Sequence, residues 1–181
     1  MTRIAHSFLA AAILLVSSSA CAEHYVSEYV DHVGNISLPA DFRGTMTHLG
    51  SWFVPVGEAS GFHDVYMDRK SVESFRKIGK FPDGAVIVKE LRAHTLGDYT
   101  TGSGVAYANE TLKQWFVMVK DVKDRFPDNA SWGDGWGWAL FKPGKDGNTS
   151  SDYKKDCLGC HIPAKANDWI YLEAYPTLTK Y

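Results

Sequence analysis

The residues with the clearest chemistry stand near the C-terminus, in the segment Cys157-Leu158-Gly159-Cys160-His161. This C-x-x-C-H pattern is the signature of c-type haem attachment. Its two thiols add to the vinyl groups of haem, and the adjacent imidazole of His161 binds the iron as proximal ligand. The pattern occurs once, so we expect one covalently attached haem c.

The cysteine pair fits a zinc site or a redox motif less well. A structural zinc site needs a second ligand pair at matching spacing, and the sequence has none. A thioredoxin-like motif begins a helix after an early strand, whereas this pair lies late in the chain. In an exported protein two cysteines often form a disulfide, but the histidine that follows them directly favours haem.

The sequence leaves the sixth iron ligand open. Small electron-transfer cytochromes c use His and Met as axial ligands, so a His/Met electron-transfer cytochrome is one candidate function. The side chains that could serve are Met46, Met67, Met118, His48, His63 and His94. An open sixth position would instead give a haem that binds small ligands or catalyses their reactions.

The N-terminal segment has the features of a secretory signal peptide. A cationic start is followed by an apolar run over 8–16 and by small residues up to Ala22. The run is too short to span a bilayer, and a lipoprotein acylated on Cys21 is a weaker alternative. We therefore expect a signal peptide over 1–22, a haem domain over 23–181 and a periplasmic location.

The composition is that of one globular domain. Hydrophobic residues make up 45% of the chain, charged residues 22%, and the net charge is −2, so no basic surface for nucleic acid is expected. Aromatic residues reach 13%, with six Trp. This content suits a flat cofactor that must be covered, or equally an aromatic-rich β core.

The elements that must position the motif are mostly strands. Asp68 and Gly79 predict the two ends of a helix over 69–78. We expect strands over 85–91, 105–109, 114–119 and 136–141, with a hairpin between the second and third of them. A Gly-rich loop is expected over 97–104 and a polar loop over 143–150. Helix is expected from 151, before an aromatic tail over 169–175. The predicted class is α+β and β-rich, with an antiparallel sheet and a few helices.

One charge is unusual within the first of these strands. Alternation places Lys89 on the same face as Ile87 and Leu91, while Glu90 lies on the other face. An ammonium among aliphatic side chains is unfavourable unless it is paired or neutralised. Lys89 is therefore a candidate functional residue, and a lysine that extends to the sheet edge is the alternative.

Several motifs together resemble the cytochrome P-460 superfamily. In the order found in that family, the chain contains Phe81 to Leu91 with Lys89, Val119-Lys120-Asp121, Arg125-Phe126, Gly135 to Ala139, Cys157 to His161, Asp168-Trp169 and Tyr175-Pro176. The resemblance extends from Phe53 to Pro176, which is most of the chain. An ordered set of this kind is far more specific than C-x-x-C-H alone.

The resemblance implies a mainly antiparallel β fold, usually a homodimer, with His161 as proximal ligand and an open or weakly filled distal side. Enzymatic members link a lysine to a haem meso carbon and oxidise hydroxylamine through an iron–nitrosyl species. Lys89 matches that lysine. The implied partners are a small nitrogen-oxide or hydroxylamine ligand and a soluble redox partner.

The chain departs from the enzymatic members at one position. Those members carry a distal carboxylate, a proton acceptor, where this chain has Phe116. Met118 shares the strand face of Phe116 and could approach the iron. Both features resemble the cytochromes c prime beta, which lack the cross-link and bind nitric oxide without oxidising hydroxylamine. Glu90, Asp98 or Glu110 could supply a carboxylate from elsewhere.

Two functions from different classes therefore remain. The first is a hydroxylamine and nitric oxide oxidoreductase whose haem is cross-linked to Lys89. The second is a nitric oxide binding protein whose haem pocket is capped by Phe116 and Met118. Lys89 favours the first function and Phe116 the second, and the residues together lean toward the cross-linked enzyme.

Overall fold

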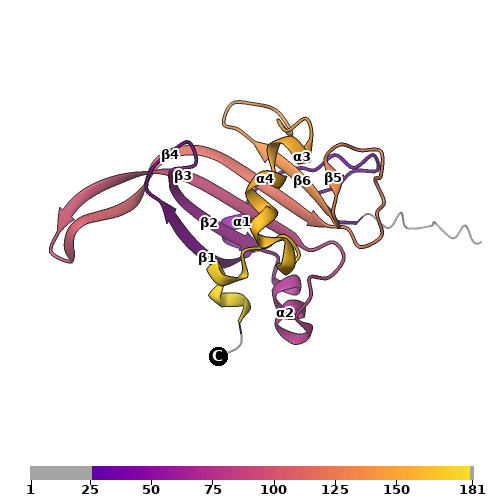
Figure 1. Cartoon of the computed structure of the whole chain (residues 1–181), viewed down its shortest axis with the longest axis horizontal. Coiled ribbons are helices and arrows are strands. Elements are labelled where there is room, and N and C mark those ends of the chain that lie inside the picture. Colours follow the sequence, from indigo (N-terminus) through magenta and orange to yellow (C-terminus); the bar gives the residue numbers. More distant parts are fainter. Residues whose placement is uncertain (1–25, 180–181) are drawn as a thin grey trace, which may run out of the picture.

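The computed structural model describes residues 26–179, so the predicted signal peptide over 1–22 lies outside the described residues. Its centre is a six-stranded antiparallel sheet with strand order β1-β2-β3-β4-β6-β5 (Figure 1). The strands are β1 Thr47–Val54, β2 Gly61–Met67, β3 Val86–Tyr99, β4 Gly102–Lys120, β5 Trp132–Gly133 and β6 Trp136–Phe141. The predicted β-rich class is confirmed.

Short helices accompany the sheet. They are α1 Phe42–Thr45, α2 Arg69–Ile78, α3 Tyr153–Asp156 and α4 Leu158–His161, followed by the 3-10 turns η1 Ile162–Asn167, η2 Leu172–Ala174 and η3 Pro176–Leu178. In Figure 1 the segment from α3 to η3 crosses in front of the sheet toward β1. Over residues 26–179, no helix has the length and apolar character that crossing a membrane requires.

The two faces of the sheet bury different residues. The front face, turned toward the C-terminal segment, buries Val65, Ile87 and Trp138 with α2 and the C-terminal turns. The back face buries Val86 and Val88 with α1 and the segment that precedes it. The predicted alternation along β3 is therefore confirmed, because adjacent residues of this strand enter different cores.

Helix α2 begins and ends where the sequence predicts. The Asp68 carboxylate accepts hydrogen bonds from the backbone N–H of Ser71 at 2.9 Å and of Val86 at 3.0 Å. Gly79 ends the helix in the left-handed conformation, with φ of 69°. Asp68 thus both caps α2 and ties it to the start of β3.

Removal of this cap should destabilise the protein. We expect Asp68→Ala to lower the free energy of unfolding by about 1–2 kcal/mol, because two backbone N–H groups lose their acceptor. Urea denaturation measures the change. Glu73→Ala, at an exposed position of the same helix, is the control, and equal losses in both variants would contradict the assigned role of Asp68.

The structure corrects the predicted loop and hairpin between residues 97 and 119. β3 continues through the Gly-rich segment to Tyr99, and β4 begins at Gly102, so the strands predicted over 105–109 and 114–119 are one strand. Tyr99 pairs with Gly102 across a two-residue turn. The aromatic and β-branched residues of this segment favour extended backbone, and Gly104 adopts a φ of 66° within the strand.

Candidate cofactor site

The C-x-x-C-H motif lies where α3 meets α4. The backbone N–H of Cys157 donates to the carbonyl of Tyr153 at 2.9 Å, which closes α3, and α4 begins at the next residue. Both thiols are free, with Cys157 buried and Cys160 exposed. Residues three and four positions apart lie on one side of a helical turn. The two thiols and His161 can therefore reach the same flat group.

The imidazole of His161 is oriented as a metal ligand requires. Its Nδ1 lies 2.7 Å from the carbonyl oxygen of Trp169, so Nδ1 donates a proton and Nε2 keeps a free lone pair. Burial lowers the pKa of His161 to about 4, so the ring is neutral at physiological pH. The rings of Trp138 and His161 pack in a T-shaped arrangement with their centres 5.0 Å apart. Tyr171 donates its hydroxyl to the carbonyl of Cys160.

A salt bridge holds the acceptor of His161 in place. Asp168 and Trp169 have φ values of 58° and 67°, a conformation unfavourable for residues other than glycine. Lys120 Nζ donates to the Asp168 carboxylate at 2.8 Å, and Trp136 Nε1 donates to the Asp168 carbonyl at 3.0 Å. These contacts fix the turn that presents the Trp169 carbonyl. Sequence patterns did not assign Lys120 or Trp136 this role.

Lys89 lies on the front face, directly beside Phe116. The two residues pair across β3 and β4, and Lys89 Nζ lies 4.0 Å from the centre of the Phe116 ring and 5.9 Å from that of Trp52. Burial lowers the pKa of Lys89 to about 8, while Cys160 and Cys157 raise it. Within the described residues no carboxylate pairs with this amine. The structure thus brings Lys89 and Phe116 together beside the haem motif.

The six candidates for the sixth ligand divide between the two faces and the edge of the sheet. Three are buried on the front face: Met67, Met118 and His63. Three lie elsewhere: Met46 in the back-face core, His48 exposed beside Ser51, and His94 beside Phe53. Met118 pairs with Ile87 and Trp138 in the sheet, so it shares the face that Lys89 and Phe116 occupy.

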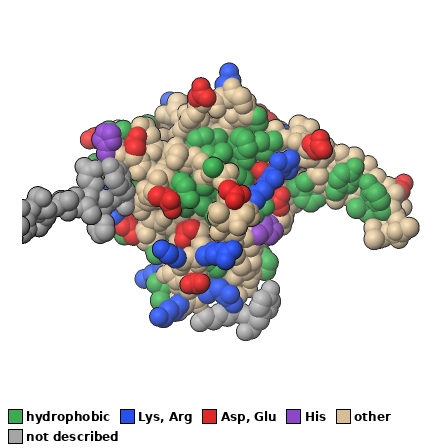
Figure 2. All heavy atoms as spheres, turned by 180° about the vertical axis from the view of Figure 1, so that it is seen from behind, with side chains coloured by type: hydrophobic (Ala, Val, Ile, Leu, Met, Phe, Trp, Pro, Cys, Tyr) green, Lys and Arg blue, Asp and Glu red, His purple; other side chains and the backbone are tan. Residues whose placement is uncertain are grey.

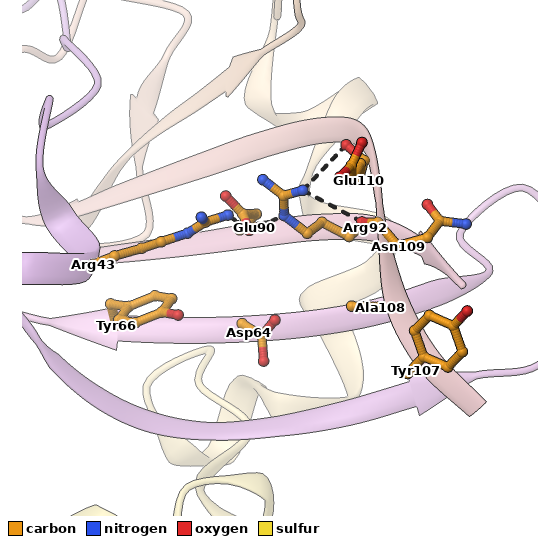
Figure 3. A pocket seen from close by; sticks show the side chains of 9 residues that line it. All are labelled: Arg43, Asp64, Tyr66, Glu90, Arg92, Tyr107, Ala108, Asn109 and Glu110. Atoms are coloured by element: carbon orange, nitrogen blue, oxygen red, sulfur yellow. Dashed lines mark hydrogen bonds and ion pairs between the residues drawn. The ribbon is translucent and has the colours of Figure 1, made fainter. Parts of the chain in front are cut away.

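Glu90 does not supply a carboxylate to the front face. It is buried on the back face, where it bonds to Arg43, to Arg92 at 2.7 Å and to Trp115 Nε1 at 3.2 Å. Glu90 and the two arginines line an open groove of about 680 Å³ (Figure 3). Both arginines satisfy the charge of Glu90, and they help to lower its pKa.

Asp98 and Glu110 also lie away from the haem motif. Glu110 lines the back groove, where its carbonyl accepts a hydrogen bond from Arg92 at 3.2 Å. Asp98 lies near the end of β3 and accepts from the backbone N–H of Gly104 at 2.8 Å. Glu90, Asp98 and Glu110 therefore do not replace the distal carboxylate whose position is occupied by Phe116 in this chain.

The residues present fit a covalently attached haem c. The thiols of Cys157 and Cys160 are unpaired, and His161 offers a neutral, oriented nitrogen. The surrounding front face is rich in aromatic side chains that can cover a flat macrocycle. Within residues 26–179, no three His, Cys, Asp or Glu side chains gather as a metal site.

A β-rich fold with this site defines a class of protein, the haem cytochromes. The family model of cytochrome P460 matches residues 39–172, a range that contains Lys89, Phe116 and the complete C-x-x-C-H motif. The chain therefore belongs to the cytochrome P460 family, as the resemblance predicted. A comparison with curated proteins finds no match.

Proposed function

We propose that the protein is a periplasmic mono-haem c-type cytochrome that oxidises hydroxylamine at a haem cross-linked to Lys89. The observation that carries the proposal is the position of Lys89. Its amine lies among aromatic rings on the face that meets the haem motif, with no carboxylate partner in the described residues. Bond formation would remove the unfavourable buried charge.

Each residue of the site has a distinct role in this proposal. Cys157 and Cys160 tether the cofactor by thioethers, and His161 Nε2 binds the iron while Nδ1–H stays bonded to Trp169. When bound, haem supplies the one-electron chemistry at a small nitrogen ligand. Oxidation of hydroxylamine to nitric oxide releases three protons and three electrons. The electrons pass to a soluble redox partner, and the protons need acceptors near the ligand.

The cross-link itself is an oxidation. One N–H of Lys89 and one C–H of the macrocycle are replaced by an N–C bond, and two protons and two electrons leave. An oxidant such as hydrogen peroxide must accept those electrons. Burial favours this reaction, because a pKa of about 8 makes the neutral amine readily accessible.

A nitric oxide binding protein is the second candidate function, and the position of Phe116 favours it. Its ring occupies the front face beside Lys89, and Met118 shares that face. An aromatic, apolar surface there would accept a diatomic ligand, and neither Phe116 nor Met118 can accept a proton. Anaerobic assays separate the two functions. The enzyme reduces a soluble electron acceptor when hydroxylamine is added, whereas the binding protein takes up nitric oxide and reduces nothing.

Replacement of Phe116 should reveal its effect on catalysis. We expect Phe116→Glu to raise hydroxylamine oxidation by about 10²-fold, because the carboxylate can accept a proton from the substrate. The control is Phe116→Gln, because glutamine has nearly the same size and shape as glutamate but no basic group. Rates are measured with a soluble electron acceptor. Similar rates in both variants and the wild type would identify Phe116 as an ordinary core residue.

We also propose that the chain forms a homodimer through the β-arm, residues 93–111, where β3 and β4 pair only with each other among the described strands. The arm extends beyond the rest of the sheet (Figure 1) and exposes apolar side chains (Figure 2). Leu96 is 61% exposed, and Tyr99 and Tyr107 are also exposed. Such a surface suits an interface, and stable interfaces bury about 1,600 Å² in total.

Light scattering after size-exclusion chromatography tests this dimer. We expect the wild type to have twice the mass of one chain and Leu96→Asp to shift it toward the monomer. Ile78→Asp places the same charge at an exposed apolar residue on α2 and should leave the mass unchanged. A monomeric wild type would contradict the proposal.

A further inference from the structure

His63 on β2 has an unused hydrogen-bond acceptor inside the front face. The residue is 4% exposed, and its Nδ1 is the one buried side-chain nitrogen or oxygen of the described chain without a hydrogen-bond partner. Nε2 lies 2.8 Å from the carbonyl oxygen of Ala59, so Nε2 carries the proton and Nδ1 carries the lone pair. Buried polar atoms are almost always paired, so this acceptor indicates a missing donor.

The orientation of this ring is held from two sides. Trp52 stacks on the imidazole with ring centres 4.9 Å apart and planes inclined by 17°. The loop whose Ala59 carbonyl accepts the hydrogen bond from Nε2–H is itself fixed by Lys113. The Lys113 ammonium donates to the carbonyl of Glu58 at 2.6 Å and to that of Ser60 at 2.9 Å. The acceptor of His63 is therefore preorganised rather than free to rotate.

The sheet register places His63 next to the proposed reaction site. His63 and Val65, two residues apart in β2, both lie on the front face. Val65 pairs with Lys89, so His63 is the diagonal neighbour of Lys89. Such diagonal neighbours are about 7–8 Å apart and within reach of long side chains. Trp52 borders both, because it stacks on His63 and lies 5.9 Å from Lys89 Nζ. Burial lowers the pKa of His63 to about 4, and the charge of Lys89 contributes in the same direction, so the ring is neutral and its Nδ1 lone pair is free.

We propose that His63 Nδ1 is the proton acceptor for hydroxylamine bound at the front face, the chemistry that Phe116 lacks. Nδ1 accepts a hydrogen bond from an N–H or O–H of the ligand and takes one of the three protons that oxidation to nitric oxide releases. The three electrons leave to the soluble redox partner. The inference rests on the proposed function for its substrate.

Ligand affinity tests this role without turnover. Hydroxylamine and nitric oxide are titrated anaerobically into the ferric holoprotein, without an electron acceptor, and binding is followed by the optical spectrum. His63→Phe keeps the stacking on Trp52 but removes the acceptor. We expect its Kd for hydroxylamine to rise about 3- to 10-fold, while the Kd for nitric oxide, which has no N–H or O–H, stays the same.

Further variants make the result specific. His94→Phe changes a histidine beside Phe53 and should alter neither affinity. His63→Gln, whose amide oxygen is again an acceptor, should recover part of the hydroxylamine affinity. His63→Leu replaces His63→Phe if the larger ring does not fold.

The outcomes separate this inference from the proposed function. Equal changes in both affinities of the His63→Phe variant, or no change in either, would overturn the role of His63, as would a wild type that does not bind hydroxylamine. A different outcome is that His63→Phe selectively loses hydroxylamine affinity while the wild type never reduces an electron acceptor. That result would overturn the proposed enzyme and leave His63 as the ligand's hydrogen-bond acceptor.

Discussion

Replacement of Lys89 with leucine should abolish hydroxylamine oxidation and leave nitric oxide binding intact. Leucine keeps an apolar side chain beside Phe116 but cannot form the N–C bond to the macrocycle. Loss of the bond restores full conjugation, so the main band of the ferrous protein should move from a strongly red-shifted position to that of an ordinary c-type haem. The thioethers depend only on Cys157 and Cys160 and should persist.

Optical spectra and hydroxylamine-dependent reduction of an electron acceptor measure these effects. Lys70→Leu, at an exposed lysine of α2, is the matched control and should retain both the spectrum and the activity. A red-shifted band that survives in the Lys89→Leu protein would show that another group perturbs the haem.

A variant that lacks both thiols and the cross-linking lysine should release its haem completely when it is denatured. Cys157→Ala and Cys160→Ala are therefore combined with Lys89→Leu. In this triple variant His161 can still bind iron through Nε2, because its orientation comes from the Trp169 carbonyl rather than from the cysteines. The haem is then held by coordination and packing alone, so the denatured triple variant should have the mass of the bare chain.

Variants with one thiol sharpen this result. Each single cysteine replacement, also combined with Lys89→Leu, should retain haem through one thioether after denaturation. The wild type, made with a functioning cytochrome c maturation system, should carry one haem. Haem that stays with the denatured triple variant, or a haem-free wild type, would contradict attachment through this motif.

Local rules predicted the parts of the fold that are governed by near neighbours in the chain. Asp68 and Gly79 define α2 because caps act within one helical turn. Lys89 was placed on the correct face because alternation is regular along the first half of β3. The helical turn around Cys157 was likewise predicted.

The strands β1 and β2 were not predicted, for two physical reasons. β1 contains a register shift between His48 and Gly50, which breaks the alternation of buried and exposed residues. In β2 one buried position is occupied by His63, a residue that hydrophobicity does not mark as core. Of the β-arm, only the strand over 105–109 was predicted, because neither face of the arm is fully buried and no regular apolar alternation develops.

The site could be predicted only where a motif encoded it. Cys157, Cys160 and His161 are adjacent in sequence, and the family resemblance marked Lys89. The acceptors that orient the two histidines come from backbone carbonyls, those of Ala59 and Trp169, whose positions depend on tertiary structure. No side-chain pattern indicates a backbone acceptor, so the tautomers of both rings required the folded structure.

The proposed enzyme depends on a haem bound covalently at two places on this chain. Mass spectrometry of a tryptic digest of the mature holoprotein tests it most directly. We expect one haem joined both to the peptide that contains Cys157 and Cys160 and to the segment that contains Lys89, with the combined mass reduced by the two hydrogens lost in the cross-link. Haem found on the cysteine peptide alone would contradict the cross-linked enzyme, and the nitric oxide binding protein would then be the better account.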